Sequence, residues 1–229
     1  MFQSLFKSSL KQLNNETNET LKLTCLAKIK FARTLRRKSS CLIFDNMENR
    51  TILTGEVSAE KIHRMALEIA EQLSEDDTEL IIIGIEGAGK FGVAGTGNFI
   101  AANVAGHLKK YITSPVKTIT LHLDKQKPAV ITLSEEMNFD NKNVLLVDDV
   151  SNTGKTLLYA LKPFMQFHPK CIQTMVLVER MHKQFPIKPD FVGYSIATAP
   201  DDYVQVEEAN GSISAMLVSG DWRANVKAS

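Results

Sequence analysis

Apolar residues recur along the middle of the chain at two alternating spacings. Between residues 58 and 73 they stand three and four apart, as in an amphipathic helix, and Ser58 occupies the position expected of its N-cap. Short continuous apolar runs and further helical stretches follow. The pattern predicts strands at 80–85, 116–123, 129–134 and 143–148 and helices at 96–111 and 154–167. Because this alternation builds right-handed βαβ units, we expect an α/β fold with a central, mostly parallel sheet flanked by helices.

The pattern changes after residue 170. CIQTMVLVER, at 171–180, predicts one more strand, and FPIKPDFVGYSIA predicts another after its two prolines. DDYVQVEE and SISAMLV then alternate polar and apolar residues over short lengths. We expect these last strands to form a small antiparallel addition at the C-terminal end of the fold.

Residues 1–46 differ from the rest in composition. They are rich in Lys, Arg, Ser, Asn and Thr, and their only acidic residues are Glu16, Glu19 and Asp45. Three interpretations remain open: an upstream extension before a natural start at Met47, an organelle-targeting segment, or a basic arm for nucleic acid. We expect 1–46 to be a basic extension that is disordered or not part of the fold, and 47–229 to be the folded domain.

Bulk composition excludes several classes of protein. The chain has 229 residues, a net charge of +1 and three cysteines without CxxC spacing. These numbers are typical of one globular domain with reduced thiols, and we expect the protein in the cytoplasm. No apolar run approaches the roughly 18 residues of a membrane span, so no membrane partner is expected.

The segment NVLLVDDVSNTGKTLLYAL, at 143–161, carries the most specific chemistry. Asp148 and Asp149 follow a buried strand and emerge at its carboxyl end, where open α/β sheets bind ligands. The turn at 151–155 leads into a helix, whose first amides favour a phosphate. Two carboxylates repel a phosphate beside them, so their presence suits a sugar phosphate, whose hydroxyls can donate to the carboxylates. A divalent cation could ease the repulsion between the carboxylates and the phosphate. A Walker B strand is the rival interpretation.

The glycine-rich stretch ELIIIGIEGAGKFGVAG, at 79–95, fits three phosphate-binding signatures. As GxxxxGK it is a P-loop, but Phe91 stands where a magnesium-binding Ser or Thr is needed. As GxGxxG, formed by Gly87, Gly89 and Gly92, it is a dinucleotide fingerprint. It could also be a backbone loop beneath another phosphate.

VLLVDDVSNTGKTL resembles the phosphoribosyl-pyrophosphate motif of type I phosphoribosyltransferases. The resemblance implies that fold, and implies that Asp148 and Asp149 are catalytic and hold the ribose hydroxyls, with Mg²⁺ bound indirectly through the donor. It assigns the 5′-phosphate to Ser151, Asn152, Thr153, Gly154, Lys155 and Thr156. It favours the third interpretation of the glycine stretch, as a pyrophosphate loop made of Glu86, Gly87, Ala88, Gly89 and Lys90.

The C-terminal third resembles the bifunctional pyrimidine-operon attenuators that are also uracil phosphoribosyltransferases. The matching positions are Glu179, Arg180, His182, Pro186, Ile187, Asp190, Phe191, Val192 and Gly193. This resemblance implies a C-terminal hood over the base, with Arg180 and His182 beside it, although His182 could equally be a surface loop residue. It also implies a flexible loop containing Asp124 and Lys125.

Three departures from the family pattern concern the donor and the base. Ala88 replaces a basic residue of the pyrophosphate loop, where Glu86 adds negative charge and Lys90 could compensate or be merely solvated. Leu123 replaces an arginine of the flexible loop. Asn152 stands where the purine-salvage branch commonly has an aspartate, which argues mildly against hypoxanthine or guanine.

The sequence thus predicts a phosphoribosyltransferase that transfers phosphoribose to a nucleobase, a pyrimidine such as uracil, and releases pyrophosphate. Its partners would be phosphoribosyl pyrophosphate and the base, in a homodimer or larger assembly. The alternative is a catalytically weak, nucleotide-sensing regulator of pyrimidine genes that binds RNA. A basic face for RNA cannot be identified from the sequence, because the lysines after Met47 are dispersed.

Overall fold

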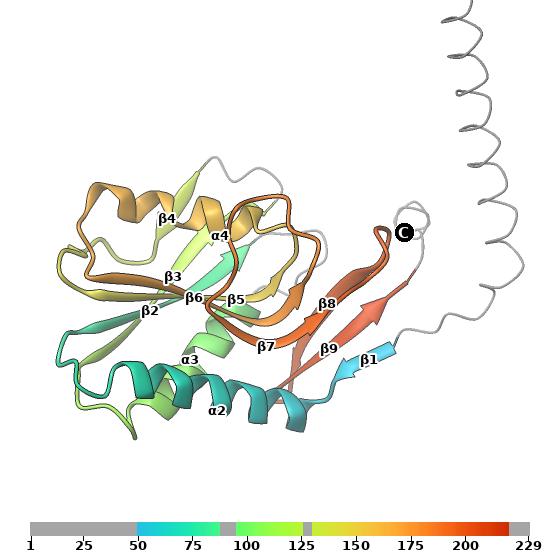
Figure 1. Ribbon diagram of the computed structural model, residues 1–229, viewed down its shortest axis with the longest axis horizontal. Helices are drawn as coiled ribbons and strands as arrows, with labels where there is room; N and C mark the ends of the chain where they lie inside the picture. The colour runs from blue at the N-terminus through green and yellow to red at the C-terminus, as the bar shows by residue number, and fades with distance from the viewer. Residues whose placement is uncertain (1–49, 88–94, 126–129, 220–229) are drawn as a thin grey trace, which may run out of the picture. The chain divides into compact units, whose positions relative to one another are not determined.

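The computed structural model describes residues 50–87, 95–125 and 130–219 (Figure 1). The extension at 1–46 lies outside the described residues, as does Met47. The helices are α2 (Gly55–Gln72), α3 (Thr96–Leu108), α4 (Lys155–Ala160) and the 3₁₀ helix η1 (Lys162–Gln166). The strands are β1 (Arg50–Leu53), β2 (Leu80–Gly87), β3 (Val116–Leu123), β4 (Ile131–Leu133), β5 (Asn143–Ser151), β6 (Cys171–Arg180), β7 (Phe191–Ile196), β8 (Tyr203–Ala209) and β9 (Ser212–Val218).

The central sheet has six strands in the order β4-β3-β2-β5-β6-β7. Strands β3, β2, β5, β6 and β7 are parallel, and only the short β4 runs antiparallel to its neighbour β3. The prediction of a mostly parallel sheet is confirmed. The strand expected at 129–134 is shorter than predicted, and it is an edge strand rather than part of a parallel crossover.

Helices cover both faces of this sheet (Figure 1), α2 and α3 on one face and α4 with η1 on the other. Side chains of β2 therefore alternate between two cores: Ile82 packs with α2 and α3, whereas Ile81 and Ile83 pack with α4 and η1. Each fully buried Ile stabilises the fold by about 1.5–3 kcal/mol. A continuous apolar run such as IIIGI is what a strand buried on both faces requires.

The first helix begins earlier than the sequence predicted. Thr54 is its N-cap and accepts a hydrogen bond from the Val57 amide at 3.4 Å. Ser58 lies within the helix, fully buried, and its hydroxyl has no hydrogen-bond partner among the described residues. The assignment of Ser58 as N-cap is therefore wrong, because the helix extends one turn before its apolar stripe.

The helix expected at 154–167 is also different. The α-helical part ends at Ala160, and the 3₁₀ helix η1 continues the chain with Pro163 near its start. Proline has no amide hydrogen and clashes with the preceding turn, so an α-helix rarely continues through it. Phe164 still packs edge-on against Phe139, which keeps this segment on the sheet.

A second sheet, which we call the hood, has the order β1-β9-β8 and is antiparallel. The C-terminal strands β8 and β9 were predicted. The four-residue strand β1 was not, because so short a segment carries no clear periodicity. Val204 and Val206 of β8 and Ile213 and Ala215 of β9 belong to the same core as α2 and α3. In the described parts of the chain, no helix is long and apolar enough to cross a membrane.

Candidate active site

The carboxyl ends of four parallel strands place the predicted site residues along one edge of the central sheet. Glu86 of β2 is the register partner of His122 of β3, and Ser151 of β5 is the partner of Glu179 of β6. Asp148 and Asp149 lie near the end of β5 between these pairs. The structure thus brings together the strand ends on which the sequence prediction depends.

Asp148 and Asp149 form a buried acid pair whose side chains are 1% and 7% exposed. The ammonium group of Lys125 lies 2.9 Å from Asp148 Oδ1 and 3.0 Å from Asp149 Oδ1. The Thr96 hydroxyl donates to Asp149 Oδ2 at 2.8 Å. Asp148 Oδ2 is buried and has no hydrogen-bond partner among the described residues. Two adjacent carboxylates are tolerated here because one cation bridges them.

The two acids differ in their protonation. Burial raises the pKa of Asp148 to about 7, against the attraction of Lys125 and with the help of repulsion from Asp149. Burial would also raise the pKa of Asp149, but the charge of Lys125 and hydrogen bonds from its neighbours hold it below its usual value. The pKa of Lys125 is raised, because the two acids outweigh its own burial. The pair therefore has one firmly ionised carboxylate and one that titrates near neutral pH.

The turn after β5 is held from outside by a later segment. Gly154 has φ = +84° and begins α4, and a side chain at this position would lie 3.1 Å from the Ile187 carbonyl. The amides of Gln184 and Phe185 both donate to the Thr153 carbonyl at 3.0 Å. These contacts fix the backbone of the turn predicted to hold the 5′-phosphate. Only glycine combines this φ with so close a neighbour.

Other members of the predicted phosphate set have contacts of their own. The Lys183 ammonium donates to the Ser151 hydroxyl at 2.7 Å and lies 3.3 Å from Glu179 Oε1. The Lys155 amide donates to the Thr153 hydroxyl at 3.3 Å. Thr156 is the second residue of α4. All six residues predicted to contact the phosphate thus lie in one short segment, from the last residue of β5 to the first turn of α4.

Arg180 connects this turn to the segment before the hood. Its guanidinium donates to Asn152 Oδ1 at 3.1 Å, to the Thr198 hydroxyl at 2.6 and 2.8 Å, and to the Ala199 carbonyl at 3.1 Å. Burial lowers the pKa of Arg180 from its usual value. His182 Nε2 lies 2.6 Å from the Thr198 carbonyl oxygen. Both residues predicted to lie by the base thus belong to one network around Thr198.

Of the predicted pyrophosphate loop, the structure describes the first two residues, Glu86 and Gly87. Glu86 Oε2 lies 3.2 Å from Asn98 Nδ2 and 3.2 Å from His122 Nδ1, so its charge has polar neighbours. Gly87 lies against the side chain of Lys125. Ala88, Gly89 and Lys90 lie outside the described residues, as does Lys127. Asp124 is exposed directly after the end of β3, next to Lys125.

Sequence reasoning missed several residues of this edge. Thr96, Lys183 and Thr198 each contact a predicted site residue that is distant in sequence. The signal available for Thr96 was its position at the start of the helix after the glycine stretch. Lys183 stands four residues after Glu179, a spacing that suggests a pair only within a helix, and this segment is not helical.

The acid pair alone does not make a complete protein site for a metal ion. Among the described residues, no three His, Cys, Asp or Glu side chains converge as metal ligands. The residues present suit a magnesium ion that takes most of its oxygen ligands from a bound substrate and water, which is the usual mode for Mg²⁺ with phosphate substrates.

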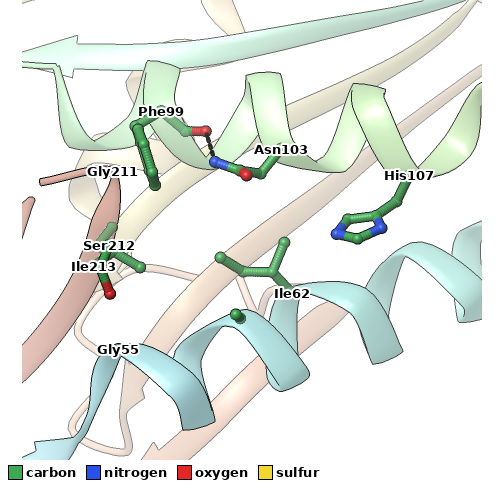
Figure 2. A pocket seen from close by; sticks show the side chains of 9 residues that line it. Gly55, Ile62, Phe99, Asn103, His107, Gly211, Ser212 and Ile213 are labelled. Carbon is green, nitrogen blue, oxygen red and sulfur yellow. Dashed lines mark hydrogen bonds between the residues drawn. The ribbon is translucent and has the colours of Figure 1, made fainter.

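Two cavities lined by described residues lie elsewhere. One of about 70 Å³ lies between α2, α3 and the turn of the hood. Figure 2 shows Phe99, Asn103 and His107 of α3 facing Ile62 and Gly55 of α2, with Ser212 and Ile213 to the side. A shallower groove continues along α3 past His107. Neither contains a residue of the sheet edge described above.

Comparisons with known proteins agree on the family. The model of the phosphoribosyl transferase domain matches residues 49–209. The bifunctional protein PyrR of Latilactobacillus sakei is 36% identical over 155 residues, 62% of this chain and 82% of the relative. PyrR of Limosilactobacillus reuteri is 34% identical over 70% of this chain and 93% of the relative.

Solved structures agree on the fold. The hypoxanthine-guanine phosphoribosyltransferase of Bacillus anthracis matches with a TM-score of 0.54 at 20% identity, over 74% of this chain and 98% of that one. The hypoxanthine phosphoribosyl transferase of Trypanosoma cruzi matches with a TM-score of 0.60 at 17% identity, over 80% and 99%. The chain therefore belongs to the phosphoribosyl transferase domain family and is a phosphoribosyltransferase of the type I fold, similar to the bifunctional PyrR proteins.

Proposed function

We propose that the chain transfers phosphoribose from phosphoribosyl pyrophosphate to a ring nitrogen of a pyrimidine base such as uracil. The observation that supports this most directly is the buried acid pair of Asp148 and Asp149, immediately before the glycine turn at 151–154. A ligand that matches both features carries hydroxyl donors next to a phosphate. Phosphoribose has this chemistry.

Each group has a proposed role in the reaction. Asp148 and Asp149 accept hydrogen bonds from the ribose hydroxyls, and their negative field stabilises the positive charge that develops at the anomeric carbon. The turn from Ser151 to Thr156 anchors the 5′-phosphate and so aligns the reacting carbon. The bond from this carbon to the pyrophosphate oxygen breaks, the oxygen keeps the electron pair, and the base nitrogen forms the new bond and loses its proton.

Magnesium is proposed to enter with the donor. Asp148 and Asp149 are the residues that would hold it, indirectly through the substrate. When bound, Mg²⁺ neutralises the charge of the departing pyrophosphate and orients it. The predicted pyrophosphate loop, from Glu86 to Lys90, belongs to the same proposal.

The base is proposed to lie near Arg180 and His182. Their common network with Asn152 and Thr198 offers several polar groups beside the phosphate turn. An amide at Asn152, where the purine-salvage branch commonly has a carboxylate, favours a pyrimidine. The similarity to the PyrR proteins favours the same choice. A homodimer or larger assembly and a cytoplasmic location stay predictions.

Replacement of the acid pair tests the proposal. We expect Asp149→Asn to lower kcat for pyrophosphate release by about 100-fold or more, since it removes a charge that stabilises the transition state. Asp77→Asn is the matched control, because Asp77 is exposed before β2 at the opposite edge of the sheet. Turnover of Asp149→Asn within twofold of the wild type would show that the role assigned to this acid is wrong.

A second function is proposed because the relatives are named as bifunctional proteins. In this alternative the chain binds RNA and uses the nucleotide site as a sensor. A gel shift with the leader transcript of the pyrimidine genes tests it. Specific binding should weaken steeply as salt increases, since phosphate contacts release counterions.

A further inference from the structure

Lys125 lies inside the proposed ribose site. Its ammonium group contacts the Oδ1 atoms of Asp148 and Asp149 at 2.9 and 3.0 Å, and its side chain is 24% exposed. This residue comes from the end of β3, two strands away from β5 in the sheet order. The contact therefore connects the end of β3 to β5. A substrate bound at the acid pair would have to break this contact or bind beside Lys125.

The other oxygens of the acid pair are not open to a ligand. Asp149 Oδ2 accepts from the Thr96 hydroxyl at 2.8 Å in a buried contact. Asp148 Oδ2 is itself buried. A sugar hydroxyl that reaches the pair must therefore use the two Oδ1 atoms, and these are the atoms that Lys125 contacts.

Gly87 provides the space for this arrangement. A Cβ atom built on Gly87 would lie 2.4 Å from Cγ, 2.7 Å from Cε and 2.8 Å from Cδ of Lys125. The backbone of Gly87 is not in the left-handed region, so alanine is compatible with its conformation. The absence of a side chain at Gly87 is thus what lets the stem of Lys125 lie flat across the end of β2.

We propose that Lys125 acts as an internal plug of the ribose site. In the ligand-free protein its ammonium occupies the two Oδ1 atoms and offsets part of the negative charge of the acid pair, and phosphoribose binds only when its hydroxyls replace that ammonium. Donor binding and withdrawal of Lys125 are then one coupled event. This inference rests on the proposed function, because it requires that phosphoribose binds at the acid pair.

Calorimetric titration of the full chain with ribose 5-phosphate tests the plug. This probe has the hydroxyls and the 5′-phosphate but no pyrophosphate, so other contacts of Lys125 with the donor do not enter. Removal of the competitor in Lys125→Met should tighten binding about tenfold, the equivalent of one charge-assisted hydrogen bond. Lys117→Met is the matched control on the same strand, where Lys117 pairs with Glu135 instead, and its affinity should equal that of the wild type.

The outcomes separate the two proposals. If the wild type binds ribose 5-phosphate and Lys125→Met binds no tighter, the plug is wrong and the proposed function stands. If neither protein binds ribose 5-phosphate or magnesium phosphoribosyl pyrophosphate, the proposed function fails and the plug fails with it.

Chemical labelling of lysines tests the same idea without a binding constant. In the free protein, acetylation of Lys125 measured by mass spectrometry should be slower than that of Lys109, which is exposed after α3. Saturating ribose 5-phosphate should speed labelling of Lys125. Gly87→Ala should speed labelling of Lys125 even without ligand, because the new methyl group displaces the side chain of this lysine. Equal labelling of Lys125 and Lys109 in the free protein, or slower labelling with ligand, would overturn the plug.

Discussion

At the scale of single residues, the site depends on compensation between neighbouring charges. Asp149 has Lys125 and Thr96 as partners, whereas one oxygen of Asp148 is left without a partner among the described residues. Burial therefore affects the two acids differently, and Asp148 has a pKa of about 7. The same edge of the sheet thus combines a permanent charge with one that depends on proton binding.

Arg180 provides a prediction at this scale. Arg180→Lys keeps the charge but cannot reproduce the planar set of bonds to Asn152, Thr198 and Ala199. If the network positions the base, the KM for the base should rise about tenfold, as expected for the loss of one such bond, while the KM for phosphoribosyl pyrophosphate changes little. Steady-state kinetics with each substrate varied in turn measure both constants.

Arg64→Lys is the control for this substitution. Arg64 is half-exposed on α2 and bonds to the carbonyl of Val192, away from the network around Thr198. Identical constants for Arg180→Lys and Arg64→Lys would contradict a role of Arg180 at the base.

Most of the site residues predicted from the sequence are contiguous in the chain. Asp148, Asp149 and the turn that follows form a single motif, and a strand followed by a tight turn leaves little freedom for their placement. Thr96 and Lys183 lie 53 and 32 positions from their partners in the site. Such pairs are created by the packing of separate elements, so no local pattern could predict them.

At the scale of elements, the start of α2 shows that residue type alone can suggest the wrong N-cap. Ser58 has the residue type of an N-cap, yet it is buried one turn inside the helix, and Thr54 caps instead. The apolar stripe begins after the helix does, because the first turn is largely exposed. Helix boundaries taken from apolar periodicity alone are late in such cases.

A pair of substitutions tests this assignment. Thr54→Ala should lower the free energy of unfolding by about 1 kcal/mol, the usual cost of losing an N-cap. Ser58→Ala should leave stability unchanged or raise it, since the buried hydroxyl has no hydrogen-bond partner among the described residues to lose. Urea denaturation of both variants measures the effects, and the reverse order would restore Ser58 as the cap.

The opposite edge of the sheet offers a prediction about pH. Asp76 accepts hydrogen bonds from Lys170, Thr78 and Asn143, and these contacts lower its pKa, with Lys170 contributing most. A carboxyl group whose pKa is lower in the folded state stabilises the protein above the pKa of the unfolded chain, about 4. That stabilisation is lost as the pH falls below this value.

Asp76→Asn should therefore lower the Tm at pH 7, and the difference from the wild type should shrink as the pH falls below about 4. Glu75→Gln, one residue earlier and exposed, is the control. Thermal unfolding followed by circular dichroism across this pH range measures the effect. A difference that stays constant with pH would show that ionisation of Asp76 does not stabilise the fold.

At the scale of the whole molecule, the sequence predicted the parallel sheet and its two layers of helices, because β2 and β5 are continuous apolar runs between periodic helices. It did not predict that β1, which precedes every strand of the central sheet in sequence, completes the hood beside β9. Strand pairing over such a distance depends on the closure of the whole domain. The alternation of the short strand β1 is too brief to indicate it.

One assay tests the central claim most directly. The full chain is given phosphoribosyl pyrophosphate and magnesium with uracil, orotate, hypoxanthine, guanine or adenine in turn, and release of pyrophosphate is measured. We predict release with uracil, at a rate that Asp149→Asn lowers by about 100-fold or more. Release with a purine base alone would contradict the pyrimidine assignment, and no release with any base would contradict the proposed enzyme and favour a sensor.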